Sequence, residues 1–137
     1  MVMDKIYIAG HTGMVGSSIM RCLKKTSENI ITKTHSELDL TNQKDVFDFF
    51  ADERPEKVYL AAGMVGGIYA NDSFPADFIY NNIMIQTNVI HSAFKSGVKR
   101  LLFLASSSAY PKLSIQPIKE ESLLTGQIGR ASCRERV

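Results

Sequence analysis

Seven residues near the amino terminus have the types and spacing of a turn that binds phosphate groups. Glycine recurs every third position in the segment Gly10, His11, Thr12, Gly13, Met14, Val15 and Gly16. Gly10 permits a tight turn, Gly13 lets the backbone approach a pyrophosphate, and Gly16 lets a following helix pack closely on the preceding strand. The free N–H groups at the start of that helix would face the anion. The pattern predicts a dinucleotide site where a strand precedes it and a helix follows; a purely structural turn is the alternative.

The surrounding sequence supplies both elements in an alternating series. Short β-branched or aromatic runs predict strands at residues 5–9, 29–32, 57–61 and 100–106. Amphipathic spacing predicts helices at residues 14–25, with an apolar face of Val15, Ile19, Cys22 and Leu23, and at residues 43–53, with Val46, Phe49 and Phe50. The order predicts an α/β fold, a Rossmann-type doubly wound parallel sheet. We expect Cys22 to be a small buried hydrophobe.

A third helix is predicted to open near Ser73 or Pro75 and to run to Gly97, a residue type that often ends helices. One apolar stripe has spacings of three and four and comprises Ile79, Ile83, Gln86, Ile90 and Phe94. Further apolar residues lie outside it, namely Phe78, Met84, Ile85 and Val89. Two interpretations stay open. Either a second copy of the chain covers one face of the helix in a homodimer, or the helix is deeply buried against the sheet of its own chain.

The end of the second predicted strand bears on the choice of dinucleotide. A unit that binds NAD usually has an acidic residue there, about 20 residues after the turn, to accept hydrogen bonds from the ribose hydroxyls. Residues 30–36 contain no acid, and Lys33 and His35 are basic instead. Because basic side chains suit a 2′-phosphate, we expect NADP(H), with NAD(H) less favoured. The alternative is that Lys33 and His35 are solvated loop residues.

Composition argues against several other classes of protein. With 45% hydrophobic and 22% charged residues in 137 positions, the chain is expected to form one ordinary globular domain. It has no run of membrane-spanning length and no secretory signal, so we expect a cytoplasmic location and no membrane partner. The net charge of +2 equals that of residues 130–136 alone, and we expect no nucleic-acid partner. Two cysteines, Cys22 and Cys133, make neither a disulfide framework nor a zinc cluster, and no metal site is expected.

Several segments resemble known enzymes. The glycine turn, Asp39-Leu40 and residues 61–63 resemble the extended branch of the short-chain dehydrogenase/reductases. Within that branch, six segments of this chain resemble the GDP-L-fucose synthase family. They are residues 8–11 (IAGH), 58–62 (VYLAA), 65–68 (VGGI), 75–80 (PADFIY), 101–104 (LLFL) and 110–112 (YPK). That family epimerises GDP-4-keto-6-deoxy-D-mannose at two ring carbons and reduces its ketone with NADPH. The resemblance covers residues 5–127 and implies a GDP-sugar as substrate.

The resemblance also implies roles for individual residues. NADP(H) would be held by the glycine turn and by His35, Ser36, Glu37, Leu38, Asp39, Leu40, Ala61, Ala62, Leu104, Ala105, Ser106 and Ser107. Ser106 matches the catalytic serine, whose hydroxyl would hydrogen-bond the C4 carbonyl oxygen of the substrate. Asn88 matches a helix asparagine that orders the active-site region in the superfamily; an amide on the helix surface is the alternative.

Two positions depart from the family pattern. Ser108 stands where a cysteine usually acts as acid and base, and would be its catalytic counterpart. A serine hydroxyl has no accessible anion near neutral pH, which weakens the case for epimerisation by the thiol route. Thr12 stands where an arginine that binds the 2′-phosphate is common, which weakens the case for NADP.

The proton donor of the superfamily is a tyrosine followed four positions later by a lysine, which lowers the tyrosine pKa. None of the five tyrosines has a lysine at that spacing. After Gln127 the sequence turns abruptly arginine-rich. We expect residues 1–127 to be the N-terminal part only of an NAD(P)-binding Rossmann domain, residues 128–137 to be a non-native tail, and the chain alone to be inactive in hydride transfer.

Two further functions stay open. The chain could belong to another NAD(P)-dependent sugar-nucleotide epimerase or dehydratase, although those enzymes are not expected to share residues 65–68 or the region of residues 80–82. It could also be a non-catalytic dinucleotide-binding module, which needs neither the tyrosine and lysine pair nor a serine hydroxyl above the nicotinamide.

Overall fold

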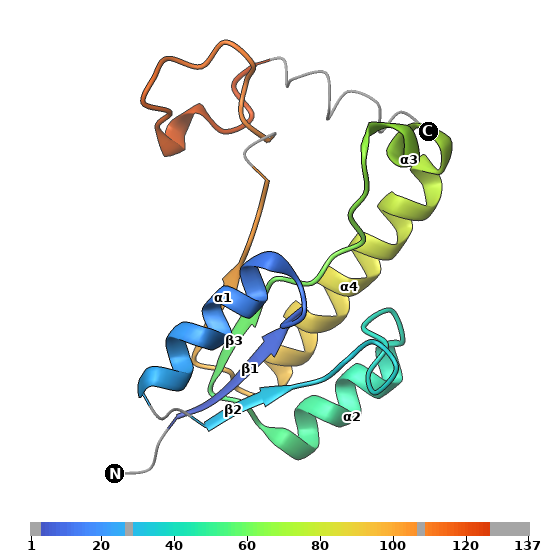
Figure 1. Cartoon of the computed structure of the whole chain (residues 1–137), viewed down its shortest axis with the longest axis vertical. Helices are drawn as coiled ribbons and strands as arrows, with labels where there is room; N and C mark the ends of the chain where they lie inside the picture. The colour runs from blue at the N-terminus through green and yellow to red at the C-terminus, as the bar shows by residue number, and fades with distance from the viewer. Residues whose placement is uncertain (1–3, 27–28, 107–108, 127–137) are drawn as a thin grey trace. The chain divides into compact units, whose positions relative to one another are not determined.

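The computed structural model of the chain describes residues 4–26, 29–106 and 109–126 (Figure 1). The chain divides into two compact units, the first comprising residues 1–64 and 80–104 and the second residues 65–79 and 105–137. The expected tail at residues 128–137 lies outside the described residues.

The first unit is built on a parallel sheet. Its strands β1 (Lys5–Ala9), β2 (Asn29–Thr32), β3 (Lys57–Leu60) and β4 (Arg100–Phe103) lie in the order β2-β1-β3-β4. Tyr7 of β1 is opposite Ile31 of β2 on one side and Val58 of β3 on the other. The predicted parallel α/β sheet is confirmed, although β3 and β4 end earlier than residues 61 and 106.

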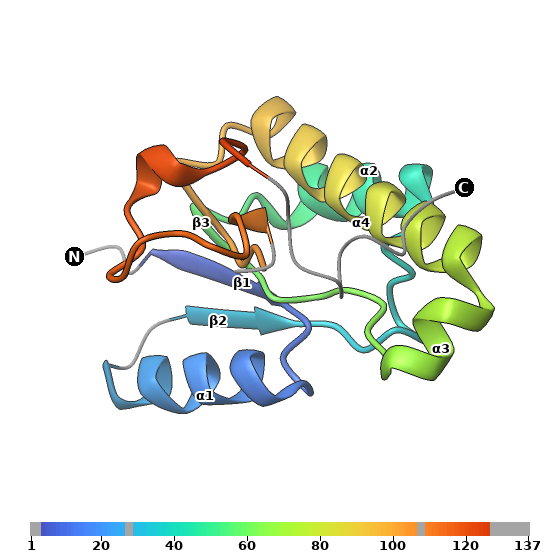
Figure 2. The same cartoon turned by 90° about the horizontal axis from the view of Figure 1, so that it is seen from above.

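Helices cover both faces of this sheet. Figure 2 shows α1 (Met14–Leu23) on one side and α2 (Gln43–Glu53) and α4 (Pro75–Lys95) on the other. Alternate residues of β1 supply both faces, because successive side chains of a strand point in opposite directions. The core toward α2 and α4 consists of Tyr7, Ala9, Leu38, Val46, Phe50, Val58, Leu60, Val89 and Ala93. A sheet covered on both faces confirms the doubly wound prediction.

The helix boundaries follow local signals in the sequence. Asn42 begins α2, because its side-chain oxygen accepts hydrogen bonds from Lys44 N at 3.1 Å and Asp45 N at 3.4 Å. Gly97 ends α4 with φ +78°, and Val98 N–H then donates to Ala93 O at 3.0 Å. The 3₁₀ turn η1 (Lys24–Thr26) follows α1, so the predicted helix over residues 14–25 is shorter than expected.

The expectation for Cys22 is wrong, and the structure assigns the faces of α4, which the sequence had left open. Cys22 is exposed, because the side of α1 that meets the sheet is centred on buried Gly16 and half-buried Ile19 and Leu23. On α4, the stripe selected by spacing points outward: Ile83, Ile90 and Phe94 are 54%, 43% and 80% exposed. The helix packs on its own sheet through Ile85, Val89 and Ala93 instead.

The second unit contains a helix that the sequence did not predict. α3 (Ile68–Ser73) is six residues long and begins after Gly67. Asn71 Nδ2 donates to Gly66 O at 3.0 Å and to Gly67 O at 3.1 Å, which ties the start of the helix to its first turn. The same unit carries the 3₁₀ turn η3 (Glu120–Ser122).

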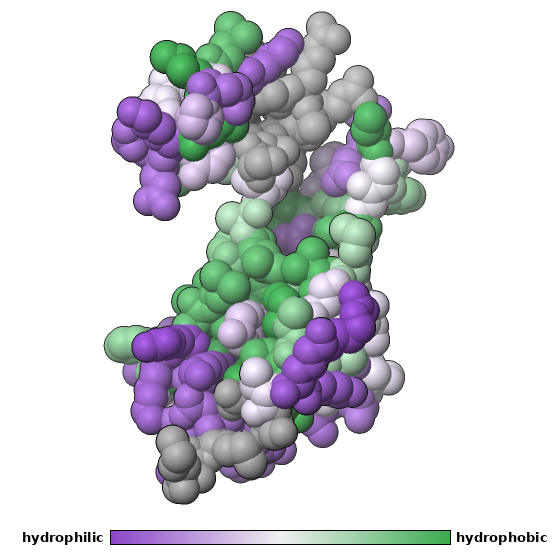
Figure 3. All heavy atoms as spheres, turned by 60° about the vertical axis from the view of Figure 1, so that its left-hand side comes forward, coloured by the Kyte–Doolittle hydropathy of each residue, from purple (hydrophilic) through white to green (hydrophobic). Residues whose placement is uncertain are grey.

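The sheet leaves apolar surface uncovered at β4. Leu102 points to the same face as its neighbour Tyr59, and it is 49% exposed. Figure 3 shows hydrophobic side chains gathered over a broad area of the molecule. Parallel sheets are normally buried on both faces, so this surface is suited to further contacts. In the part of the chain that the structure describes, no helix is long and apolar enough to cross a membrane.

Candidate dinucleotide-binding site

The glycine turn joins the end of β1 to the start of α1. Gly10 has φ +84°, a conformation that favours glycine, and its carbonyl oxygen accepts a hydrogen bond from Gly13 N at 3.1 Å. A Cβ atom on Gly10 would lie 2.7 Å from both Ala61 O and Ala62 N. The turn therefore lies directly against Ala61 and Ala62, which follow β3.

The three glycines of the turn differ in what surrounds them. A Cβ atom on Gly16 would lie 2.1 Å from Gly10 O, so helix and turn could not pack as they do. A Cβ atom on Gly13 would meet only Gly10 O at 3.4 Å, and Gly13 has an extended conformation with φ −72° and ψ 168°. The fold thus requires glycine at positions 10 and 16 and leaves open space at position 13.

The amino end of α1 is free to bind an anion. Gly13 is the N-cap and supplies no side-chain hydrogen bond to the first turn, which also has no acidic residue. Thr12, Met14 and Val15 are exposed around it. The unsatisfied N–H groups and the helix dipole both favour a phosphate there.

His11 adds a buried acceptor or donor to the same turn. Its Nδ1 atom is buried and has no hydrogen-bond partner among the described residues. Buried polar atoms are nearly always paired in folded proteins. Together with the open space at Gly13, this atom indicates that the turn fits a ligand with polar groups, as a dinucleotide pyrophosphate has.

The segment after β2 is held by short-range hydrogen bonds. Glu37 Oε2 accepts from Thr34 Oγ1 at 2.6 Å and Thr34 N at 2.7 Å, and these bonds hold the pKa of Glu37 below its usual range. Asp39 Oδ1 accepts from Thr41 N at 2.9 Å and Thr41 Oγ1 at 2.8 Å, which lowers the pKa of Asp39 in the same way. Both carboxylates therefore stay charged in mildly acidic solution.

The remaining residues expected in this segment have different surroundings. His35 Nδ1 lies 3.9 Å from Asp39 Oδ1, and its side chain is 84% exposed. Ser36 Oγ is 3.1 Å from Thr34 Oγ1. Leu38 is buried in the core and Leu40 packs against it, so these two side chains anchor the segment.

Asn88 is not a surface amide. It is 4% exposed, and its Nδ2 donates to Leu40 O and Thr41 O at 3.0 Å each. A second amide of α4, which the sequence did not single out, lies at Asn82 and is hydrogen-bonded to the backbone of Met64. The resemblance identified Asn88, whereas no local pattern in the sequence indicates the role of Asn82.

The expected catalytic segment follows β4. Leu104 N donates to Leu60 O at 3.2 Å and so continues the pairing with β3. Ala105 and Ser106 are exposed and belong to the second unit, in which Ala109 N donates to Ser106 O at 3.2 Å. The expected roles of Ser107 and Ser108 lie outside the described residues.

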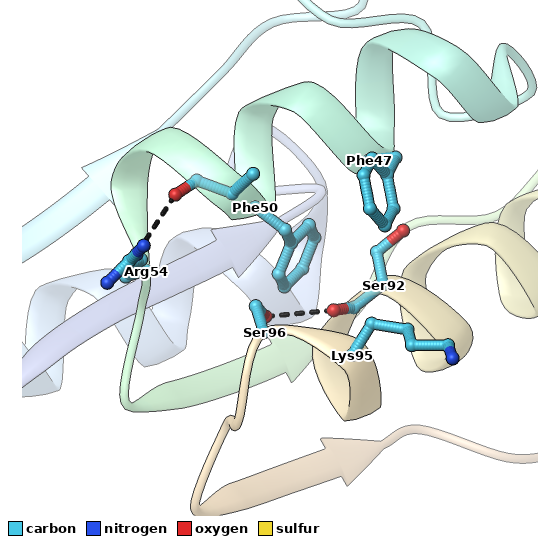
Figure 4. A pocket seen from close by; sticks show the side chains of 7 residues that line it. Phe47, Phe50, Arg54, Ser92, Lys95 and Ser96 are labelled. Carbon is cyan, nitrogen blue, oxygen red and sulfur yellow. Dashed lines mark hydrogen bonds between the residues drawn. The ribbon is translucent and has the colours of Figure 1, made fainter.

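A groove between α2 and α4 is a separate feature (Figure 4). Arg54 and Ser96 in its lining lie three and four residues before β3 and β4, so the groove lies near the amino ends of these strands. Arg54 Nε donates to Ala51 O at 3.2 Å and Ser96 Oγ to Ser92 O at 2.8 Å. These side chains satisfy carbonyl groups at helix ends, which gives them a structural role.

The parallel sheet, the positive φ of Gly10 and the open amino end of α1 define a Rossmann-type α/β fold. The chain belongs to the NAD dependent epimerase/dehydratase family, whose sequence model matches residues 6–134. Over 125 residues it is 59% identical to the putative GDP-L-fucose synthase 2 of Arabidopsis thaliana, covering 90% of this chain and 38% of that protein. It is 51% identical over 126 residues to the GDP-L-fucose synthase of Escherichia coli (strain K12), covering 91% and 39%.

A solved structure agrees with these relatives. The GDP-mannoheptose C4 reductase from Campylobacter jejuni with NADP bound is 44% identical and superposes with a TM-score of 0.88 over 96% of this chain and 42% of that one. The chain thus spans about two fifths of the length of the proteins it matches, and it corresponds to their N-terminal part.

Proposed function

We propose that this chain is the NADP(H)-binding part of an epimerase/reductase that acts on a GDP-sugar. The observation that carries the proposal is the difference among the three glycines. Backbone atoms close the space beside Gly10 and Gly16, while Gly13 opens onto the uncapped amino end of α1. The similarity to GDP-L-fucose synthases and to a reductase with NADP bound supports the same ligand.

The residues after β2 support NADP(H) over NAD(H). Glu37 is the first acid after β2, and it is turned back onto Thr34. Lys33 and His35 are then the basic side chains nearest the end of the strand that can meet a 2′-phosphate. Thr12 carries no charge and cannot replace the arginine that is common at its position. The proposed preference for NADP(H) over NAD(H) therefore depends on Lys33 and His35.

The fluorescence of NADPH, titrated with the protein, tests this proposal. We expect saturable binding of NADPH and weaker binding of NADH, and we expect Lys33→Glu to reverse the order by repelling the 2′-phosphate. Arg54→Glu is the matched control, because Arg54 lies at the opposite end of the strands. If neither dinucleotide binds to the unaltered protein, the proposal is wrong.

We further propose roles in the reduction of a GDP-sugar. NADPH supplies the hydride when it is bound. The Ser106 hydroxyl would donate a hydrogen bond to the carbonyl oxygen of the substrate, where negative charge develops. No tyrosine of the chain has a lysine four positions later, so the chain has no such pair to donate the proton. We therefore expect the chain to bind NADPH without reducing the keto-sugar. Oxidation of NADPH by the chain and GDP-4-keto-6-deoxy-D-mannose would contradict this expectation.

The outward stripe of α4 supports a proposal of self-association. Ile83, Ile90 and Phe94 are large, apolar and exposed along one side of the helix. We propose that a second copy of the chain covers them. Light scattering should give the mass of a dimer, and Phe94→Glu should give a monomer; a monomeric unaltered chain would refute this.

A further inference from the structure

The groove between α2 and α4 consists of two adjoining hollows, which share Phe47 and Ser92 in their lining. Their volumes are about 220 and 320 Å³, so together they have the size of a small-molecule site. Every lining residue belongs to the first compact unit. The groove lies near the amino ends of β3 and β4, whereas the glycine turn follows the carboxyl end of β1. It is therefore a separate place for a ligand.

A serine hydroxyl on the floor of the groove has no partner. Ser92 is 2% exposed, and what remains accessible of it faces the groove. Its carbonyl oxygen accepts a hydrogen bond from Ser96 Oγ at 2.8 Å, but its own hydroxyl makes none to the described residues. Figure 4 shows this hydroxyl directed toward Phe47. Polar groups on buried side chains are nearly always paired, so the hydroxyl indicates a ligand with a polar atom in the groove.

The ionisable side chains that line the groove are all basic. Arg54 and Lys95 line the first hollow and Lys44 and His91 the second, and no carboxylate of a described residue lines either. Lys44 Nζ already lies 2.6 Å from Asp48 Oδ2. Arg54 and Lys95 have no carboxylate partner within the part of the chain that the structure describes. The first hollow therefore offers unneutralised positive charge to an anion.

The backbone of Arg54 has a conformation that few arginines adopt. Its φ of 45° and ψ of 58° lie in the left-handed region, which favours glycine or asparagine at the end of a helix. Its Nε donates to Ala51 O at 3.2 Å, which leaves the two terminal nitrogens of the guanidinium group for another acceptor. A guanidinium group with free terminal nitrogens suits a phosphate.

The remaining wall of the groove is an exposed aromatic ring. Phe47 is 48% exposed, although Phe50 beside it is buried in the core. On α4, Lys95 follows Ser92 by three positions, so the cation and the hydroxyl share one face of the helix. An aromatic wall next to a hydroxyl and two cations combines a surface for a flat ring with a surface for a phosphate.

We propose that this groove binds a nucleoside monophosphate. The phosphate accepts a hydrogen bond from Ser92 Oγ and pairs with Arg54 and Lys95. The base packs against the ring of Phe47 and extends into the second hollow. This site is additional to the dinucleotide site and does not depend on it.

The test is a ¹⁵N-correlated NMR titration with adenosine 5′-monophosphate. The protein is first saturated with NADPH, so that the nucleotide cannot occupy the dinucleotide site. We expect saturable shifts of the backbone N–H groups of Phe47, Ser92 and Lys95, and none at the glycine turn. Inorganic phosphate and adenosine should each bind at least about tenfold more weakly, because each lacks one half of the contacts. If the protein does not bind NADPH, the same titration without it still decides the proposal by the same signals.

Variants of the groove provide matched pairs. Ser92→Ala and Arg54→Gln should each raise the Kd for the nucleotide by about tenfold or more, because each removes a hydrogen bond to a charged group. Ser96→Ala and Lys44→Gln are the controls and should stay within about twofold of the unaltered protein, because Ser96 and Lys44 already have partners. Since the Ser92 hydroxyl has no partner in the fold, Ser92→Ala should unfold in urea as the unaltered protein does.

Three outcomes would overturn the proposal. The first is the absence of shifts in the groove with adenosine 5′-monophosphate. The second is equal binding of inorganic phosphate, which would show a simple anion site. The third is that Ser92→Ala binds the nucleotide as tightly as Ser96→Ala does.

Discussion

Replacing Gly13 by alanine should separate the binding role of the glycine turn from its folding role. The backbone at Gly13 has φ −72° and ψ 168°, which alanine adopts without strain, and the added methyl group would meet only Gly10 O at 3.4 Å. Alanine gains about 0.4–1 kcal/mol by restricting the unfolded chain, and it is a poorer N-cap than glycine. These effects oppose each other, so we expect the free energy of unfolding to change by less than about 1 kcal/mol.

Binding should respond quite differently. The methyl group would stand between a pyrophosphate and the N–H groups of the first turn of α1. A hydrogen bond to a charged group contributes about 1.5–3 kcal/mol, and about 1.4 kcal/mol corresponds to a tenfold change in affinity. Loss of one such bond in Gly13→Ala should therefore raise the Kd for NADPH by about 10- to 100-fold.

Gly16→Ala is the matched control. Its methyl group would lie 2.1 Å from Gly10 O, a contact that backbone atoms cannot relieve without moving α1 away from the turn. Overpacking of this kind usually costs about 1–3 kcal/mol or more. Urea unfolding and NADPH titration of both variants would check the prediction. The reasoning is refuted if Gly13→Ala binds NADPH as tightly as the unaltered protein, or is destabilised as much as Gly16→Ala.

Three other expectations follow from single contacts. Asn42→Ala should lower the free energy of unfolding by about 1 kcal/mol in urea, because Asn42 caps α2; no change would show that the cap contributes nothing. Because Thr41 holds the pKa of Asp39 down, this carboxylate stabilises the fold above its unfolded pKa and ceases to do so as the pH falls through its folded pKa. Urea unfolding from roughly pH 5 to pH 2 should thus cost the unaltered protein more stability than Asp39→Asn; parallel curves would contradict this. Leu102→Lys should reduce light scattering on storage, because Leu102 is half-exposed on an uncovered face; unchanged aggregation would place its cause elsewhere.

The sequence predicts well those features that depend on residues close together along the chain. The strand, glycine turn and helix at residues 5–23 are local, and so are the end of α4 at Gly97 and the bounds of α2. The faces of α4 could not be predicted, because Ile83 and Val89 are equally apolar and spacing alone does not say which side meets the sheet. α3 is short, and its segment has no apolar periodicity to reveal it.

The site was predicted unevenly for the same reason. Each glycine of the turn was given a role, and the structure adds that only Gly13 opens onto free space. The hydrogen bonds from Asn88 to Leu40 and from Asn82 to Met64 join residues far apart in the sequence. Such contacts follow from the packing of α4 on the sheet, which no short motif encodes.

A ¹⁵N-correlated NMR titration of the unaltered protein with NADPH tests the central claim most directly. If the dinucleotide binds at the glycine turn, the largest shifts should belong to the backbone N–H groups of Gly13, Met14, Val15 and Gly16, with further shifts at Asp39 and Leu40. Shifts confined to the groove between α2 and α4, or no shifts at saturating NADPH, would contradict the account.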